Sequence, residues 1–111
     1  MSETIEWLRK TYKKPMIGFG GIPMCGPRKW AVCRDGFTVS IQAGRGPYCT
    51  PSTVLKDCNY QTVELGFPNM ADDIIMEYAE NSGNPTDTVY ANVPIEVVDE
   101  LLAKHGGIKD D

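Results

Sequence analysis

The chain has 111 residues, of which 41% are hydrophobic and 23% are charged, and its net charge is −4. This length suits one domain, and a chain of this size can bury a core without metals or disulfides. No stretch approaches the roughly 20 apolar residues of a membrane span, and an acidic total disfavours direct nucleic-acid binding. The first residues lack the pattern of a signal peptide. We therefore expect a single domain over residues 1–111, in the cytoplasm, with its four cysteines as free thiols.

Charge is divided unevenly along the chain. Residues 1–58 hold nine Lys and Arg against four acids, whereas residues 59–111 hold two Lys against eleven acids. Because folding brings the halves together, we expect them mainly to neutralise each other. The alternative is a basic patch on an acidic body.

The first predicted element is a helix over residues 3–12. Ser2 is placed to cap its start, since a serine oxygen can accept a bond from a free N–H of the first turn. Ile5, Leu8 and Tyr12 fall on one face at helical spacing.

The clearest local pattern is that of a β-hairpin at about residues 30–43. Segments 30–34 and 37–43 are β-prone and are joined by Asp35 and Gly36. This pair is typical of a type I′ turn, in which both central residues take positive φ. Apolar and polar side chains alternate along the second segment, which indicates one buried face and one exposed face.

The remaining elements alternate between strand and helix. They are a strand over 61–67, a helix over 70–80 with Asn69 as its cap, and a short strand over 88–91. A final helix begins near Pro94 and ends at a glycine pair. Its apolar stripe consists of Ile95, Val98, Leu101 and Leu102.

This order of elements predicts an α+β fold. We expect a small antiparallel sheet that contains the hairpin, with helices packed on one face.

The cysteines and the single histidine give little sign of catalysis. No Cys-x-x-Cys pair is present, so we predict no metal site and no cofactor. His105 follows the apolar stripe of the last helix, where a histidine most often packs at the edge of the core. The alternative is a small cysteine-dependent enzyme with Cys49 as nucleophile and His105 as base.

Two segments rich in glycine and proline, residues 18–29 and 44–51, flank the hairpin and are predicted loops. Glycine lets the backbone approach an anion, arginine can hold a phosphate, and an aromatic ring can stack on a base. The predicted ligand-binding residues are Arg28, Lys29, Arg45, Tyr48 and Thr50. The alternative is that the glycines only turn the chain sharply.

The acids of the second half allow another hypothesis. Asp72, Asp73, Glu77 and Glu80 can line one side of the predicted helix and imitate a row of phosphates toward a basic protein. The alternative is an ordinary solvated face.

Several runs of sequence resemble a group of small uncharacterised proteins encoded by bacteriophages and prophages. The runs cover roughly residues 36–108 and begin at Gly36, Tyr48, Val63, Val89, Val93 and Lys104. The resemblance implies an accessory protein of the host cytoplasm that acts by binding, for instance as an inhibitor in counter-defence. We therefore expect a non-enzymatic protein that titrates or inhibits a host component. Its partner is a small nucleotide-like anion or a host protein, and a homo-oligomer is compatible with the sequence.

Overall fold

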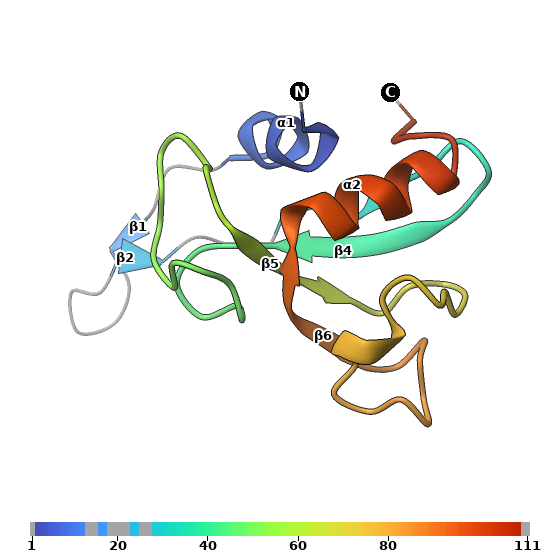
Figure 1. Cartoon of the computed structure of the whole chain (residues 1–111). Helices are drawn as coiled ribbons and strands as arrows, with labels where there is room; N and C mark the ends of the chain where they lie inside the picture. The colour runs from blue at the N-terminus through green and yellow to red at the C-terminus, as the bar shows by residue number, and fades with distance from the viewer. Residues whose placement is uncertain (1, 13–15, 18–22, 25–27, 110–111) are drawn as a thin grey trace.

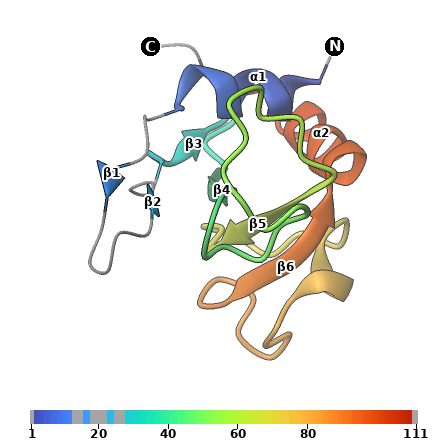
Figure 2. The same ribbon diagram turned by 90° about the vertical axis from the view of Figure 1, so that its left-hand side faces the viewer.

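The computed structural model of the chain describes residues 2–12, 16–17, 23–24 and 28–109. Four strands form one antiparallel sheet in the order β3-β4-β5-β6, and β1 pairs separately with β2 (Figures 1 and 2). The elements in chain order are α1 (Glu3–Lys10), β1 (Met16–Ile17), β2 (Pro23–Met24), β3 (Ala31–Val32), β4 (Thr38–Gln42), β5 (Thr62–Gly66), the 3₁₀ turn η2 (Met76–Tyr78), β6 (Val89–Pro94) and α2 (Ile95–Lys104). The predicted α+β class and its antiparallel sheet with a hairpin are confirmed.

The two helices lie next to each other in both views (Figures 1 and 2). Asp99 of α2 joins them, because its Oδ1 accepts bonds from Ser2 Oγ at 2.9 Å and from Thr4 Oγ1 at 2.6 Å. The Thr4 backbone N–H donates to the same oxygen at 2.9 Å. That both helices cover a single face of the sheet stays a prediction.

α1 begins where the sequence predicts. The Ser2 hydroxyl accepts the Ile5 backbone N–H at 3.1 Å, which satisfies one free donor of the first turn. The helix ends at Lys10, and Trp7 and Leu8 are its buried apolar residues. The buried face therefore centres on these two side chains, while Ile5 packs only partly against the core.

The hairpin is confirmed, but its predicted turn type is wrong. Ala31 pairs with Val39, and the loop closes through a bond from Gly36 N to Cys33 O at 3.0 Å. Gly36 has a φ of 96°, whereas Asp35 is not among the described residues with positive φ. The turn is therefore a three-residue loop with glycine at its left-handed position, and not a type I′ pair.

The helix predicted over residues 70–80 is wrong, since this segment forms turns that end in η2. Asn69, its predicted cap, instead bonds the hairpin: its side chain accepts the Thr38 N–H at 3.0 Å and donates to Gly36 O at 2.9 Å. Asp72 accepts the Ile74 N–H at 3.0 Å. Short polar side chains that bond nearby backbone groups in this way stabilise turns in competition with helix.

The end of the chain agrees with the prediction. Strand β6 leads directly into α2, whose four predicted stripe residues are all buried. The helix stops at two glycines with φ of 87° and 83°, and Gly107 N donates to Leu102 O at 2.8 Å. This is the left-handed stop that glycine permits.

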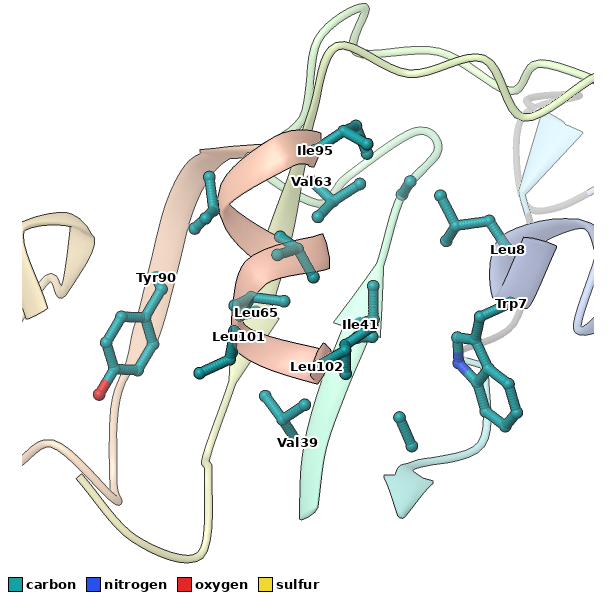
Figure 3. Packing of buried hydrophobic residues seen from close by; sticks show 14 of the residues in the cluster. Trp7, Leu8, Val39, Ile41, Val63, Leu65, Tyr90, Ile95, Leu101 and Leu102 are labelled. Atoms are coloured by element: carbon teal, nitrogen blue, oxygen red, sulfur yellow. The ribbon is translucent and has the colours of Figure 1, made fainter. Parts of the chain in front are cut away.

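The core lies between α2, α1 and the sheet (Figure 3). Among its fully buried side chains are Leu8, Val39, Ile41, Val63, Leu65, Tyr90, Leu101 and Leu102. None of the helices in the described part of the chain has the length and apolarity to cross a membrane.

Candidate functional site

Arg28, a predicted ligand contact, is buried and holds the fold together. Its Nη1 donates to Ala43 O at 2.8 Å, and its Nε and Nη2 both approach Leu8 O at 3.4 Å. Its backbone N–H donates to Gln42 Oε1 at 2.8 Å. With 6% of its surface exposed, the residue bridges α1 and the end of β4. Arg28 is therefore a structural bridge, and its predicted ligand contact stays a prediction.

The two glycine-rich segments meet at this bridge. Arg28 belongs to the first segment, and its bond partner Ala43 directly precedes the second. Residues 18–22 and 25–27 of the first segment lie outside the described part of the chain. Lys29 is exposed, and its Nζ lies 5.4 Å from the centre of the Trp7 ring, at the helix side of the molecule. This is the geometry of a cation–π contact. Lys29 therefore faces α1.

The other three predicted residues come together on the second loop. Hydrogen bonds fix this loop on both sides of Tyr48: its N–H donates to Glu64 Oε2, and its carbonyl accepts the Asn92 N–H, both at 3.0 Å. The Thr50 hydroxyl donates to Asn92 Oδ1 at 3.3 Å. Asn92 has a φ of 50°, a left-handed conformation that asparagine tolerates better than most residues.

This loop exposes chemistry that suits an anion. Arg45, Tyr48 and Thr50 are all exposed, Tyr48 by 52%. Among the described residues, none forms a hydrogen bond or ion pair with the Arg45 guanidinium. Two cavities of about 230 and 260 Å³ lie elsewhere, against α1. The loop is thus an open surface with one available cation.

Cys49 and His105 do not form a catalytic pair. The Cys49 thiol is buried and bonds the Gly44 backbone, with Sγ 3.3 Å from its N and 3.2 Å from its O. Burial raises the pKa of this thiol, which disfavours the reactive thiolate. The imidazole has other partners on both ring nitrogens.

His105 is held between two carboxylates at the end of α2. Its Nδ1 lies 2.6 Å from Asp35 Oδ2, and its Nε2 lies 2.8 Å from Asp72 Oδ2. The side chains of His105 and Asp72 are 7% and 2% exposed, and Lys104 Nζ lies 3.1 Å from Asp72. We name Asp35, His105, Asp72 and Lys104 the histidine bridge.

Both carboxyl groups of the histidine bridge favour the ionised form. The Phe37 N–H, followed by His105, lowers the pKa of Asp35. Burial alone would raise the pKa of Asp72, but bonds from the Ile74 N–H, His105 and Lys104 outweigh it and lower the pKa. Two carboxylates need two N–H donors, so the geometry fits the doubly protonated imidazole. No ring nitrogen is left to accept a proton from a substrate.

The described residues hold no group of three or more His, Cys, Asp or Glu arranged to bind a metal ion. Lys10 aside, none of the ion pairs between described residues joins a lysine or arginine of the first half to an acid of the second half. For the other described residues, the expected neutralisation therefore does not occur through direct pairs.

An exposed apolar surface that the sequence analysis did not predict lies beside β3 and β5. It consists of Trp30, Val32, Phe67 and Met70, which we name the apolar patch; each side chain is more than a third exposed. The rings of Trp30 and Phe67 lie 6.4 Å apart at 44°.

Strand register explains why these side chains gather. Ala31 is buried in the hairpin, so its neighbours Trp30 and Val32 point to the opposite face. Val32 pairs with Thr38, and Thr38 in turn bonds Asn69, which lies between Phe67 and Met70 in sequence. In the sequence, the signal for this patch is the alternation of two large apolar residues, Trp30 and Val32, with two small residues, Ala31 and Cys33.

Phe67 is unusual in conformation as well as exposure. Its φ is 50°, a value that costs a bulky residue of the order of 1 kcal/mol or more. Burial does not compensate for this cost, because 43% of its surface is exposed. Backbone strain of this kind concentrates at binding and catalytic sites.

Cations follow the same edge of the sheet. Ile108 bridges Cys33, and the Lys109 N–H donates to Val32 O at 2.6 Å, so Lys109 lies beside the apolar patch. Lys29 and Arg34, before and after β3, are also exposed. The one exposed acid of the hairpin, Asp35, is paired with His105.

Comparison with known proteins finds no matching family model, no curated protein and no solved structure.

Proposed function

We propose that this chain is a non-enzymatic binding protein whose apolar patch docks on a partner protein. The observation that carries the proposal is the exposed contact between Trp30 and Phe67, combined with the left-handed backbone of Phe67. Large exposed aromatic side chains at the centre of a surface are the usual anchors of protein interfaces. A strained exposed phenylalanine has no evident benefit to the fold itself.

The charges around the apolar patch indicate the kind of partner. Lys109 lies next to Val32 of the apolar patch, whereas the carboxylate of Asp35 in the hairpin loop is paired with His105. A partner with an apolar centre and an acidic rim on the corresponding side complements this arrangement. The resemblance to phage proteins supports a host protein as this partner and inhibition or titration as the outcome, as in counter-defence.

The loop at residues 44–51 supports a second candidate function, capture of a nucleotide-like anion. Its support is the unpaired guanidinium of Arg45 beside the exposed ring of Tyr48 and the Thr50 hydroxyl. Native mass spectrometry against pooled nucleotides tests it. A retained nucleotide that is lost in Arg45→Ala supports this candidate, and a bare chain with every nucleotide rejects it.

The test of the leading proposal is affinity capture followed by calorimetry with the purified partner. Trp30→Ala combined with Phe67→Ala should weaken binding by roughly 30-fold or more, as expected for interface anchors. Tyr48→Ala is the matched control, because it removes an equally exposed aromatic ring at the other end of β4. The proposal fails if the double variant binds like the wild type, or if only the Tyr48 variant loses binding.

A further inference from the structure

The histidine bridge joins three segments that are distant in sequence. His105 ends α2, Asp35 lies in the hairpin loop, and Asp72 follows β5. Backbone bonds support the junction, since Asp35 N donates to His105 O at 3.3 Å and Arg34 N donates to Gly107 O at 3.0 Å.

Two of these segments also carry the apolar patch. The hairpin holds Trp30 and Val32, and the segment from Phe67 to Asp72 holds the other two members. Asn69 bonds Gly36 and Thr38 of the hairpin, so the segment between Phe67 and Met70 is hydrogen-bonded to the hairpin that supplies Asp35. His105 therefore contacts both segments that carry the patch.

The bridge depends on the charge of the imidazole. A doubly protonated ring donates to both carboxylates, whereas a neutral ring has a single N–H. Loss of that proton leaves a nitrogen lone pair facing a carboxylate oxygen at 2.6 or 2.8 Å. Two electron-rich atoms at this distance repel each other, so one of the two carboxylates must move away from the ring.

We propose that the charge of His105 regulates the apolar patch, so that partner binding weakens when the imidazolium loses its proton. The effect on partner binding rests on the proposed function, whereas the coupling between His105 and the apolar patch is a property of the free protein.

The other groups around His105 do not replace this charge. Lys104 is half exposed and pairs with Asp72, and Arg34 donates to Gly106 O at 2.6 Å. Burial raises the pKa of Cys33 to about 11 and also raises that of Tyr90, so both stay neutral near pH 7. Phe37, stacked on the imidazole, carries no titratable group. Glu3 faces Cys33 and accepts the Ile108 N–H at 2.8 Å.

The test is ¹⁵N NMR of the free protein, residues 1–111, over a range of pH. The chain has one histidine, so its ring signals are unambiguous. We expect protons on both ring nitrogens while the two carboxylate contacts are intact. As the pH rises and one proton is lost, the Trp30 indole and Asn69 amide signals should shift on the same curve, while Tyr48 stays constant.

Two outcomes would overturn the inference: a ring with a single proton while both carboxylate contacts are intact, or loss of the second proton with no change at Trp30 and Asn69. His105→Gln should abolish the pH response of the Trp30 signal, and the wild-type titration decides the matter if this variant does not fold. The titration is done without a partner, so it tests the regulation separately from the proposed function. If His105 and the patch are coupled in the free protein but no partner binds the patch, only the proposed function is refuted. Partner binding at the patch without coupling would refute only the regulation.

Discussion

The imidazole of His105 stacks on the ring of Phe37, with centroids 4.0 Å apart and planes within 9°. Phe37 is fully buried and directly follows the hairpin loop that supplies Asp35. A cationic ring above an aromatic face is stabilised by the ring's quadrupole. The hairpin loop and the end of α2 are therefore joined by apolar and ionic contacts together.

Asp72→Asn should destabilise the fold strongly. Its carboxylate is almost fully buried and faces both His105 and Lys104, so the variant leaves the imidazolium without one of its two anions. We expect the free energy of unfolding in urea to fall by about 2 to 4 kcal/mol. Asp73→Asn, at the exposed neighbouring position, should change it by less than about 0.5 kcal/mol. Equal effects of the two variants would contradict the assigned role of Asp72.

Stability should fall in acid. The folded pKa values of Asp35 and Asp72 lie below their ordinary value of 3.8. A carboxyl group with a lowered folded pKa stabilises the fold above its unfolded pKa, and this contribution is lost as the pH falls through the folded value. Urea unfolding should therefore show a decline in the free energy of unfolding below about pH 4. The decline should be shallower in His105→Gln, and an identical decline would argue against the histidine bridge.

Arg28→Met tests whether this arginine is structural. The variant leaves Ala43 O without its buried donor and removes the contact to Leu8 O. We expect the free energy of unfolding to fall by about 2 to 4 kcal/mol, because buried bonds from a charged donor are costly to remove. Lys29→Met, which loses only the contact to the Trp7 ring, should cost less than about 1 kcal/mol. Unchanged stability with loss of an anionic ligand would contradict the structural role of Arg28 and support its predicted ligand contact.

Phe67→Asn separates binding from folding. Asparagine accepts a φ of 50° with less strain, and Phe67 is largely exposed, so stability should stay within about 1 kcal/mol of the wild type. Partner affinity should nevertheless fall by roughly tenfold or more. Tyr48→Asn serves as the control, and it should leave affinity unchanged. A large loss of stability in Phe67→Asn would mean that the ring supports the fold.

Local patterns in the sequence predict much of this fold. The hairpin and α2 follow from alternation, a glycine turn and a helical stripe, and in both cases the buried residues are the expected ones. Local patterns did not show that residues 70–80 form turns and not a helix. Asn69 and Asp72 bond the hairpin and His105, which are distant in sequence, and those contacts determine the local conformation.

The candidate site was harder to predict for the same reason. Arg28 has the chemistry of a ligand contact, and only tertiary structure shows that backbone carbonyls surround it. His105 was expected at the edge of the core, but its two carboxylate partners come from positions 70 and 33 residues away. The apolar patch combines residues at the start of the hairpin with residues that follow β5, and no local pattern connects these two segments.

The most direct test of the apolar patch as the binding surface is an NMR perturbation map of the labelled protein saturated with its purified partner. We predict that the Trp30 indole signal and the Val32 and Phe67 amides shift or broaden, while Tyr48 remains unchanged. Perturbations confined to residues 45–50, with Trp30 unaffected, would contradict the account and assign binding to the glycine-rich loop.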